Sequence, residues 1–167
     1  MTTSPASEPV GSPQWLDAGE RQAWLRLAGL MIKLPAALDA QLQRDAGVSH
    51  FEYLVMSGLS EAPSRKLRMS ELAVLANGSL SRLSHVVKRL ERQGWVRRVP
   101  CEFDRRATNA ILTEAGYAKV VATAPGHVAA VRGLVIDPLT PAELAQLGTL
   151  ANTLLTSLDP DGHCPGS

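Results

Sequence analysis

The sequence predicts a mainly α-helical fold with a minor β component, in which two short helices are followed by a β-hairpin. Hydrophobic residues make up 45% of the 167-residue chain, whereas aromatic residues make up only 4%. This composition favours helices that pack through Leu, Ala and Val. Apolar residues recur at spacings of three and four through most of the chain, and β-favouring residues flank a polar loop near position 100. The length is sufficient for one domain with its own core.

The first helical region is expected over residues 14–46, followed by a shorter helix. Pro35 predicts a kink or a break near position 34, because proline lacks the N–H that a helix interior requires. Gly47 closes this region, and Ser49 is a candidate N-cap for the next helix. Residues 64–68 then form a basic loop or a very short strand.

Two short helices and a tight turn follow. Ser70 is the candidate N-cap of the first helix, and Asn77-Gly78 supplies the turn. The second helix has one apolar stripe, formed by Leu80, Leu83, Val86, Val87 and Leu90. Its other face is polar and basic, with Ser81, Arg82, Ser84, His85, Lys88, Arg89 and Arg92. These are the parts of a helix-turn-helix, although an ordinary amphipathic helix with a solvated basic face has the same pattern.

A basic β-hairpin completes the module. Gly94 ends the second helix, residues 95–99 form one strand, and residues 109–113 form the return strand. The tip between them presents Arg105 and Arg106, which suit phosphates or the negative potential of a minor groove. Asp104 is expected to hold the Arg106 guanidinium through a charge-assisted pair. The hairpin turns the helix-turn-helix into a winged helix-turn-helix.

Positive charge is concentrated in this module. Residues 65–106 contain eleven Lys/Arg and four Asp/Glu, a net charge of +7, whereas the rest of the chain carries −6. A nearly neutral protein with its positive charge in one quarter of its length is expected to have a polyanionic partner there. A solvated surface that happens to be basic is the alternative.

Two long helices are expected after the hairpin. The first starts at Glu114, with Thr113 as its cap, and is softly broken around Pro125-Gly126 before it ends near Val135. Thr140-Pro141-Ala142-Glu143 is a strong helix start, with Thr140 as the cap, Pro141 at the first helical position and Glu143 completing a capping box. The final helix has a wide apolar face of Leu144, Leu147, Leu150, Ala151, Leu154, Leu155 and Leu158. Pairing with the first helix and with a second subunit would cover this face, and packing within its own chain is the alternative.

Several of these motifs together resemble the MarR family of bacterial transcriptional regulators. The resemblance rests on Leu72-Ala73, Ser79-Leu80-Ser81-Arg82-Leu83-Ser84, Lys88-Arg89-Leu90-Glu91, Gly94, Asp104-Arg105-Arg106 and Leu112-Thr113-Glu114-Ala115-Gly116, and it extends over about residues 14–158. It implies an obligate homodimer that binds double-stranded DNA at a pseudo-palindromic operator, with a recognition helix in the major groove and a wing in the minor groove. It also implies release by a small ligand or by oxidation, as expected of a repressor.

The candidate DNA-binding residues lie on the second short helix and the hairpin. Small hydroxyl side chains near a helix start suit close approach to phosphates, and Arg82 and His85 are long enough to reach base edges. The full set is Ser79, Ser81, Arg82, Ser84, His85, Lys88, Arg89, Arg98, Arg105 and Arg106. By analogy with relatives, a ligand pocket between the dimerisation helices and the DNA-binding lobe would be lined by Trp24, Leu27, Met31, His50 and Tyr53, each of which could equally be plain core.

The sequence favours no catalytic or metal site. It contains no nucleophile elbow, phosphate-binding glycine loop or supported carboxylate pair, so we expect neither an enzyme nor a cofactor. The histidines and the two cysteines, Cys101 and Cys164, lack metal-ligand spacing. Arg97 and Arg98 would favour the thiolate of Cys101, which leaves a Cys101-based thiol switch as one alternative function. A dimeric protein-interaction module without useful DNA binding is the other.

The expected organisation is a single MarR-like domain between two tails. Residues 1–13 are expected to be a disordered tail without a signal peptide, and residues 159–167 a flexible tail. Residues 14–46 and 114–158 would form the dimerisation helices, and residues 49–113 the DNA-binding lobe. No apolar run is expected to reach membrane-spanning length, so we expect a cytoplasmic protein.

Overall fold

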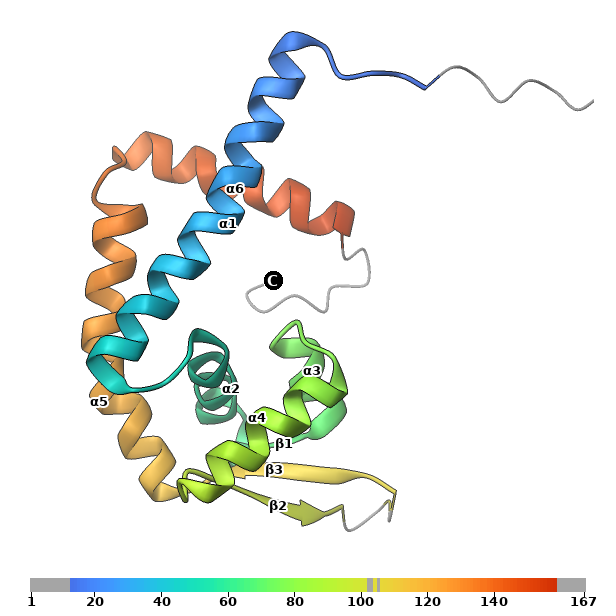
Figure 1. The fold of residues 1–167 in the computed structure, drawn as a ribbon, viewed down its shortest axis with the longest axis vertical. Helices are drawn as coiled ribbons and strands as arrows, with labels where there is room; N and C mark the ends of the chain where they lie inside the picture. The colour runs from blue at the N-terminus through green and yellow to red at the C-terminus, as the bar shows by residue number, and fades with distance from the viewer. Residues whose placement is uncertain (1–12, 102–103, 105, 159–167) are drawn as a thin grey trace, which may run out of the picture. The chain divides into compact units, whose positions relative to one another are not determined.

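The computed structural model describes residues 13–101, 104 and 106–158, which are mainly helical with one small antiparallel sheet (Figure 1). The predicted fold class is therefore confirmed. The chain divides into two compact units, Met1–Lys33 and Leu34–Ser167. Apart from Pro13, both predicted tails lie outside the described residues.

Helix α1 (Ala18–Ala46) begins in the first unit and ends in the second. It continues through Pro35, so the break expected there is absent, and the boundary between the two units falls at Leu34 instead. Its N-terminal half exposes large apolar side chains, among them Trp24, Met31 and Ile32.

Helix α2 (His50–Glu61) begins at the predicted cap. Ser49 Oγ accepts the Glu52 N–H at 3.1 Å, and Glu52 Oε2 accepts the Ser49 N–H at 2.7 Å, so the two residues form a capping box. After α2, Ser64 and Arg65 both have positive φ, 55° and 52°, which is unfavourable for residues with side chains. Contacts of Arg65 hold this turn: its guanidinium lies 3.7 Å from the ring centroid of Tyr117 and 2.8 Å from Glu114 Oε1.

Helices α3 (Met69–Leu75) and α4 (Leu80–Arg92) form the helix-turn-helix. The cap predicted for α3 is wrong by two positions. Arg68 is the N-cap, and its main-chain N–H donates to Glu71 Oε2 at 3.0 Å, so Ser70 lies inside the helix. Leu83, Val87 and Leu90 are buried on the predicted apolar stripe of α4 and join a core that includes Leu42, Val55, Met56, Leu59 and Leu72.

Strands β1 (Lys66–Arg68), β2 (Val96–Pro100) and β3 (Thr108–Leu112) form a sheet in the order β1-β3-β2. Both pairings are antiparallel, and β3 is central, with Arg98 opposite Ala110 on one side and Arg68 opposite Asn109 on the other. The sheet therefore ties the hairpin to the start of α3.

Helix α5 (Glu114–Val131) begins close to the junction between α4 and β2. Thr113 Oγ1 caps α5 by accepting the Gly116 N–H at 3.0 Å and donates to the Gly94 carbonyl at 2.7 Å. Gly116 is buried, and a Cβ at this position would overlap the Trp95 carbonyl oxygen. Only a glycine permits this approach of α5 to the wing.

The break predicted at Pro125-Gly126 is absent, because α5 continues past both residues. The irregular region lies later, in a π-helical turn at Arg132–Ile136, which precedes α6 (Pro141–Leu158). Thr140 and Glu143 form the predicted capping box, with Glu143 Oε2 accepting the Thr140 N–H at 2.8 Å. No residue of α6 is buried, so its leucine face is open along this helix.

The helical stretch Glu114–Ile136 contains an 18-residue window with a mean hydropathy of 1.2, so it is long and apolar enough to cross a membrane by length and composition alone. The stretch is not an uninterrupted apolar run, because it contains Glu114, Lys119 and Arg132. By itself one such helix is weak evidence for a membrane span. Lys119 lies within it, and its Nζ donates to the Ala46 carbonyl at 2.7 Å, which ties α5 to the end of α1.

Candidate nucleic-acid interface

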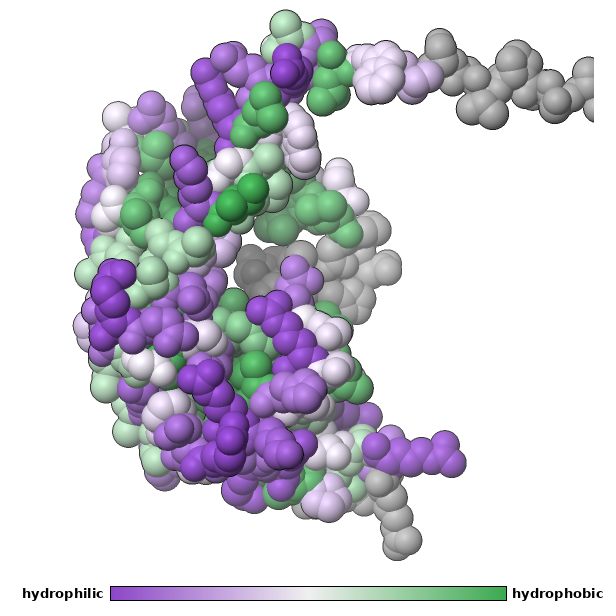
Figure 2. Space-filling view, in the orientation of Figure 1, coloured by the Kyte–Doolittle hydropathy of each residue, from purple (hydrophilic) through white to green (hydrophobic). Residues whose placement is uncertain are grey.

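Helix α4 presents three polar zones around its buried stripe. The buried stripe consists of Leu83, Val87 and Leu90. Helical periodicity places four polar residues on the opposite, outer face: Ser81, His85, Lys88 and Arg92. Arg82 and Arg89 lie on the flank toward α2, and Ser84 lies on the flank toward the hairpin. Figure 2 shows hydrophilic side chains gathered over the part of the molecule where α4 lies. The outer face of α4 can thus contact a polyanion along its length.

Two arginines of α4 are held by adjacent residues of α2. The Arg82 guanidinium carbon lies 4.1 Å from the ring centroid of Phe51, and Arg89 Nε lies 2.9 Å from Glu52 Oε1. The Glu52 side chain is 3% exposed, whereas the Arg89 side chain is 53% exposed, so a buried carboxylate anchors a surface arginine. Arg82 and Arg89 are therefore positioned before any ligand arrives.

A second carboxylate links α4 to the hairpin. Glu91 Oε1 accepts the Arg98 main-chain N–H at 2.9 Å, and Glu91 Oε2 lies 2.7 Å from Arg98 Nη2. Burial alone would raise the pKa of Glu91, but the hydrogen bonds from Arg98 and its positive charge outweigh burial and lower the pKa below its ordinary value. Glu91 is therefore ionised at neutral pH and fixes the direction of Arg98.

Asp104 acts on the turn of the hairpin rather than on a guanidinium. Its Oδ1 accepts the main-chain N–H of Arg106 at 3.0 Å, in place of the predicted pair with the Arg106 side chain. The short spacing favours this outcome, because an aspartate readily bonds the N–H two residues later in an Asx turn. Arg105 lies outside the described residues.

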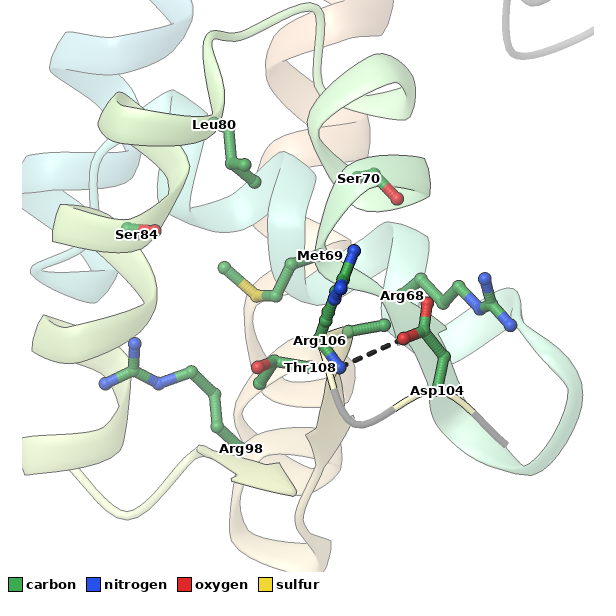
Figure 3. A pocket seen from close by; sticks show the side chains of 10 residues that line it. Arg68, Met69, Ser70, Leu80, Ser84, Arg98, Asp104, Arg106 and Thr108 are labelled. Atoms are coloured by element: carbon green, nitrogen blue, oxygen red, sulfur yellow. Dashed lines mark hydrogen bonds between the residues drawn. The ribbon is translucent and has the colours of Figure 1, made fainter. Parts of the chain in front are cut away.

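A pocket of about 360 Å³ lies between the start of α3, α4 and the hairpin. Figure 3 shows Arg106 extending between α3 and α4, with Arg98 and Ser84 toward α4 and Arg68 on the other side. Leu80, Met69 and Ser70 also line this pocket. The sequence prediction missed Arg68, Ser70, Met69 and Leu80. Arg68 was counted in the basic segment, but the sheet pairing that brings it to the hairpin is not local in sequence.

The other predicted DNA contacts lie on α4 as expected. Ser79 is the N-cap of α4, and its Oγ accepts the Arg82 N–H at 3.2 Å. Ser81, His85 and Lys88 are exposed, and Ser84 is half-buried. The structure therefore brings all described members of the predicted set to α4 and the hairpin, whereas their contacts with DNA stay a prediction.

The residues predicted to line a ligand pocket fall into two groups. Trp24, Leu27 and Met31 belong to the first unit, and His50 and Tyr53 to the second. In the second unit His50, Tyr53 and His127 cluster, with ring centroids 6.0 Å apart for the two histidines and 4.7 Å apart for Tyr53 and His127. One pocket lined by all five residues stays a prediction.

Both clustered histidines favour the neutral form. Burial lowers the pKa of His50 below 6.5, although Asp39 opposes this effect. Burial also lowers the pKa of His127, and His50 lowers it further. The Nδ1 of His127 lies 3.4 Å from Gln41 Oε1, so the cluster joins α1, α2 and α5.

The histidine cluster predicts a loss of stability in mild acid. Since the folded-state pKa values lie below 6.5, the unfolded chain takes up protons first, and the free energy of unfolding falls as pH decreases below 6.5. Urea unfolding at about pH 7.5 and about pH 5.5 measures this loss, which a His127→Gln variant should reduce. The matched control is His85→Gln on the exposed face of α4, which should retain the wild-type pH dependence; equal behaviour of the two variants would contradict this assignment.

Cys101 is 7% exposed, and its main-chain N–H donates to the Ala107 carbonyl at 2.9 Å. Burial limits access of an oxidant to this thiol. Among residues 13–101, 104 and 106–158, no three His, Cys, Asp or Glu side chains come together to hold a metal ion. Cys164 and His163 lie outside this part of the chain.

Comparisons with known proteins agree with this architecture. Residues 48–108 match the family model described as MarR family. The chain is similar to a MarR family transcriptional regulator from Streptomyces coelicolor that was solved in complex with DNA, with 46% identity, a TM-score of 0.85, and coverage of 90% of this chain and 94% of that one. It is also similar to AbsC, a MarR family transcriptional regulator from the same organism, with 36% identity, a TM-score of 0.82, and coverage of 89% of this chain and 100% of AbsC.

A shorter match links the chain to a curated relative, the HTH-type transcriptional regulator PecS of Dickeya dadantii, with 37% identity over 78 residues. That match covers 47% of this chain and 45% of PecS, so it spans less than half of the curated relative. The two structural matches extend over nearly the whole of both partners at identities well above 30%. The chain therefore belongs to the MarR family, whose members in these comparisons are transcriptional regulators.

Proposed function

We propose that this protein is a sequence-specific, double-stranded DNA-binding transcriptional regulator that acts as a homodimer. The observation that carries the proposal is the side-by-side arrangement of a cationic helix, α4, and a basic hairpin, in which Glu91 of α4 holds the Arg98 side chain of the hairpin. A helix of this kind fits the major groove, and an arginine-bearing hairpin fits the adjacent minor groove. The similar regulator from Streptomyces coelicolor was solved in complex with DNA, which supports DNA binding by this protein.

The homodimer is supported by the open apolar faces of α5 and α6. Val121 and Val128 on α5, and Leu150, Leu154 and Leu158 on α6, are exposed. Apolar faces of this extent on the terminal helices of a small domain are usually buried in an interface. A two-fold symmetric dimer would place two copies of α4 against the two halves of a pseudo-palindromic operator.

The proposed regulator is a cytoplasmic repressor released by a small molecule. A ligand that favours a dimer with wrongly spaced α4 helices would lower operator affinity through a population shift. Trp24, Leu27, Met31, His50 and Tyr53 remain the proposed ligand contacts, and the ring cluster of His50 and Tyr53 with His127 supports the second group. A compound that leaves operator affinity unchanged is excluded as the effector.

Binding to DNA tests the proposal directly. Fluorescence anisotropy of the purified protein with its own upstream intergenic duplex, against a scrambled duplex over a salt series, should give tight selective binding with a steep salt slope. Titration at high concentration should reach saturation at two chains per operator. Equal weak binding to both duplexes would contradict a specific regulator of this promoter.

Two α4 variants divide base reading from phosphate contact. Arg82→Ala should relax the preference at one base pair by about 1–3 kcal/mol, whereas Lys88→Ala should weaken binding to every sequence alike. A panel of single-base operator variants measured with both proteins tests this division. The same change on every sequence for both variants would show that the roles are wrongly assigned.

Two other functions predict different results. A dimeric interaction module without useful DNA binding would tolerate loss of the wing arginines Arg98 and Arg106. A thiol switch at Cys101 would make operator binding sensitive to oxidant in the wild type and insensitive in Cys101→Ser. The burial of Cys101 favours the regulator over the switch.

A further inference from the structure

In the proposed mode of binding, one DNA strand passes between α4 and the hairpin. One sugar–phosphate backbone separates the major groove from the adjacent minor groove. A protein that places α4 in the first groove and the hairpin in the second therefore leads one strand between them. In this structure that gap contains the pocket of about 360 Å³.

Both cationic and apolar side chains line the pocket. Arg68, Arg98 and Arg106 contribute positive charge, and Ser84 adds a hydroxyl from α4 (Figure 3). Asp104 also lines the pocket, and its Oδ1 accepts the Arg106 main-chain N–H, so the three arginines outnumber one carboxylate. Met69, which is 7% exposed, and Leu80, which is 54% exposed, supply the apolar surface. The exposed Leu80 at the start of this basic helix can therefore contact an apolar part of a ligand.

A sugar–phosphate unit has both of these chemistries. Its phosphate is an anion that guanidinium groups bind with charge-assisted hydrogen bonds, and its deoxyribose has apolar edges. A free inorganic anion would make no use of Leu80 and Met69. The lining therefore fits a nucleic-acid strand better than a small inorganic ion.

We propose that this pocket is a subsite for the backbone of the strand that crosses from the major to the minor groove, and that Arg68 is a further DNA-binding residue. The inference rests on the proposed function. Arg98, already fixed by Glu91, and Arg106 contact the phosphate in the pocket, and Leu80 contacts the adjoining sugar. Arg68, on the other side of Arg106, contacts the next phosphate of the same strand.

The position of Arg68 separates its role from that of α4. Arg68 is exposed at the end of β1, paired with Asn109 of β3, and is not part of the helix that reads bases. Its contribution should therefore be the same on every sequence. Its main-chain N–H donates a hydrogen bond to Glu71 Oε2, and an alanine variant retains this N–H. The start of α3 should therefore be unchanged by the substitution.

Arg68→Ala should weaken binding about 10-fold or more on operator and scrambled duplexes alike. It should also reduce the salt slope by about one for each subunit bound. A methylphosphonate removes the charge of one phosphate, so duplexes that each carry a single methylphosphonate locate the contact. At one position per half-site, the modification should lower the affinity of the wild type but should scarcely lower the affinity of Arg68→Ala, which has already lost the contact. Arg44→Ala, an exposed arginine at the end of α1, is the matched control and should bind like the wild type.

Each outcome decides the inference. Unchanged affinity and salt slope in Arg68→Ala, together with binding by the wild type, would overturn the subsite and leave the proposed function standing. A loss confined to one duplex sequence would also overturn it, because it would indicate base reading. A wild-type protein that binds no duplex even at low salt would reject the proposed function and the subsite together. Thermal unfolding of Arg68→Ala should match that of the wild type.

Discussion

Gly116→Ala should destabilise the protein by about 3 kcal/mol, the upper end of the usual range for an overpacked buried position, because the clash is with backbone. A Cβ at this position would overlap the Trp95 carbonyl oxygen, and Leu112 Cδ1 would lie 2.8 Å away. The Trp95 carbonyl also accepts the Thr113 main-chain N–H at 2.9 Å, so it cannot move without loss of that hydrogen bond. Chemical denaturation followed by circular dichroism measures the change.

The matched control for Gly116 lies in the same helix. A Cβ at Gly126 would approach Gln41 Nε2 only to 3.5 Å, an ordinary contact, and alanine favours a helix interior. Gly126→Ala should therefore be neutral or slightly stabilising. Equal stability of the two variants would show that the close approach of α5 to Trp95 is not required.

Arg89→Ala should have the second-largest effect, with a loss of about 2 kcal/mol in the free energy of unfolding as well as weaker DNA binding. The substitution leaves the Glu52 carboxylate, 3% exposed, without the Nε that lies 2.9 Å from it. The partial exposure of Arg89 places the expected loss below that of a fully buried pair. Urea unfolding and operator titration measure the two effects separately.

A double variant separates charge from packing at this pair. Glu52→Gln removes the charge and keeps a side-chain oxygen that can accept the Ser49 N–H. Glu52→Gln combined with Arg89→Ala should therefore be more stable than Arg89→Ala alone. Arg92→Ala, an exposed arginine in the last turn of α4, should leave stability unchanged. If the double variant is the less stable, the uncompensated carboxylate is not the cause of the loss.

Features set by neighbouring residues could be predicted from the sequence. The caps at Ser49 and Thr113 and the capping box at Thr140 depend on spacings of three residues, and the structure confirms all three. Periodicity also predicts the apolar stripe of α4, of which Leu83, Val87 and Leu90 are buried. Leu80, at the first position of the helix, was predicted on this stripe but is exposed. These signals were enough to place α4 and the hairpin as the candidate site.

Features set by distant residues could not be predicted. Glu52 and Arg89 are 37 positions apart, and Arg68 reaches the wing only through its pairing with Asn109, so neither has a local signature. Two local signals competed for the start of α3, the hydroxyl of Ser70 and the carboxylate of Glu71. Glu71 Oε2 accepts the Arg68 main-chain N–H, so the helix begins before Ser70. Pro125 predicted a break, but the helix continues through it and the irregular turn comes at Arg132–Ile136.

The contacts that hold three arginine side chains against Phe51, Glu52 and Glu91 have a kinetic consequence. An arginine side chain loses about 2 kcal/mol of conformational freedom when it becomes fixed, and Arg82, Arg89 and Arg98 lose much of this freedom during folding rather than on meeting DNA. A preorganised surface loses less conformational entropy on binding, so less of the interaction free energy is offset by ordering. Association with different duplexes should therefore proceed at similar rates, and discrimination between them should lie in how long each complex persists.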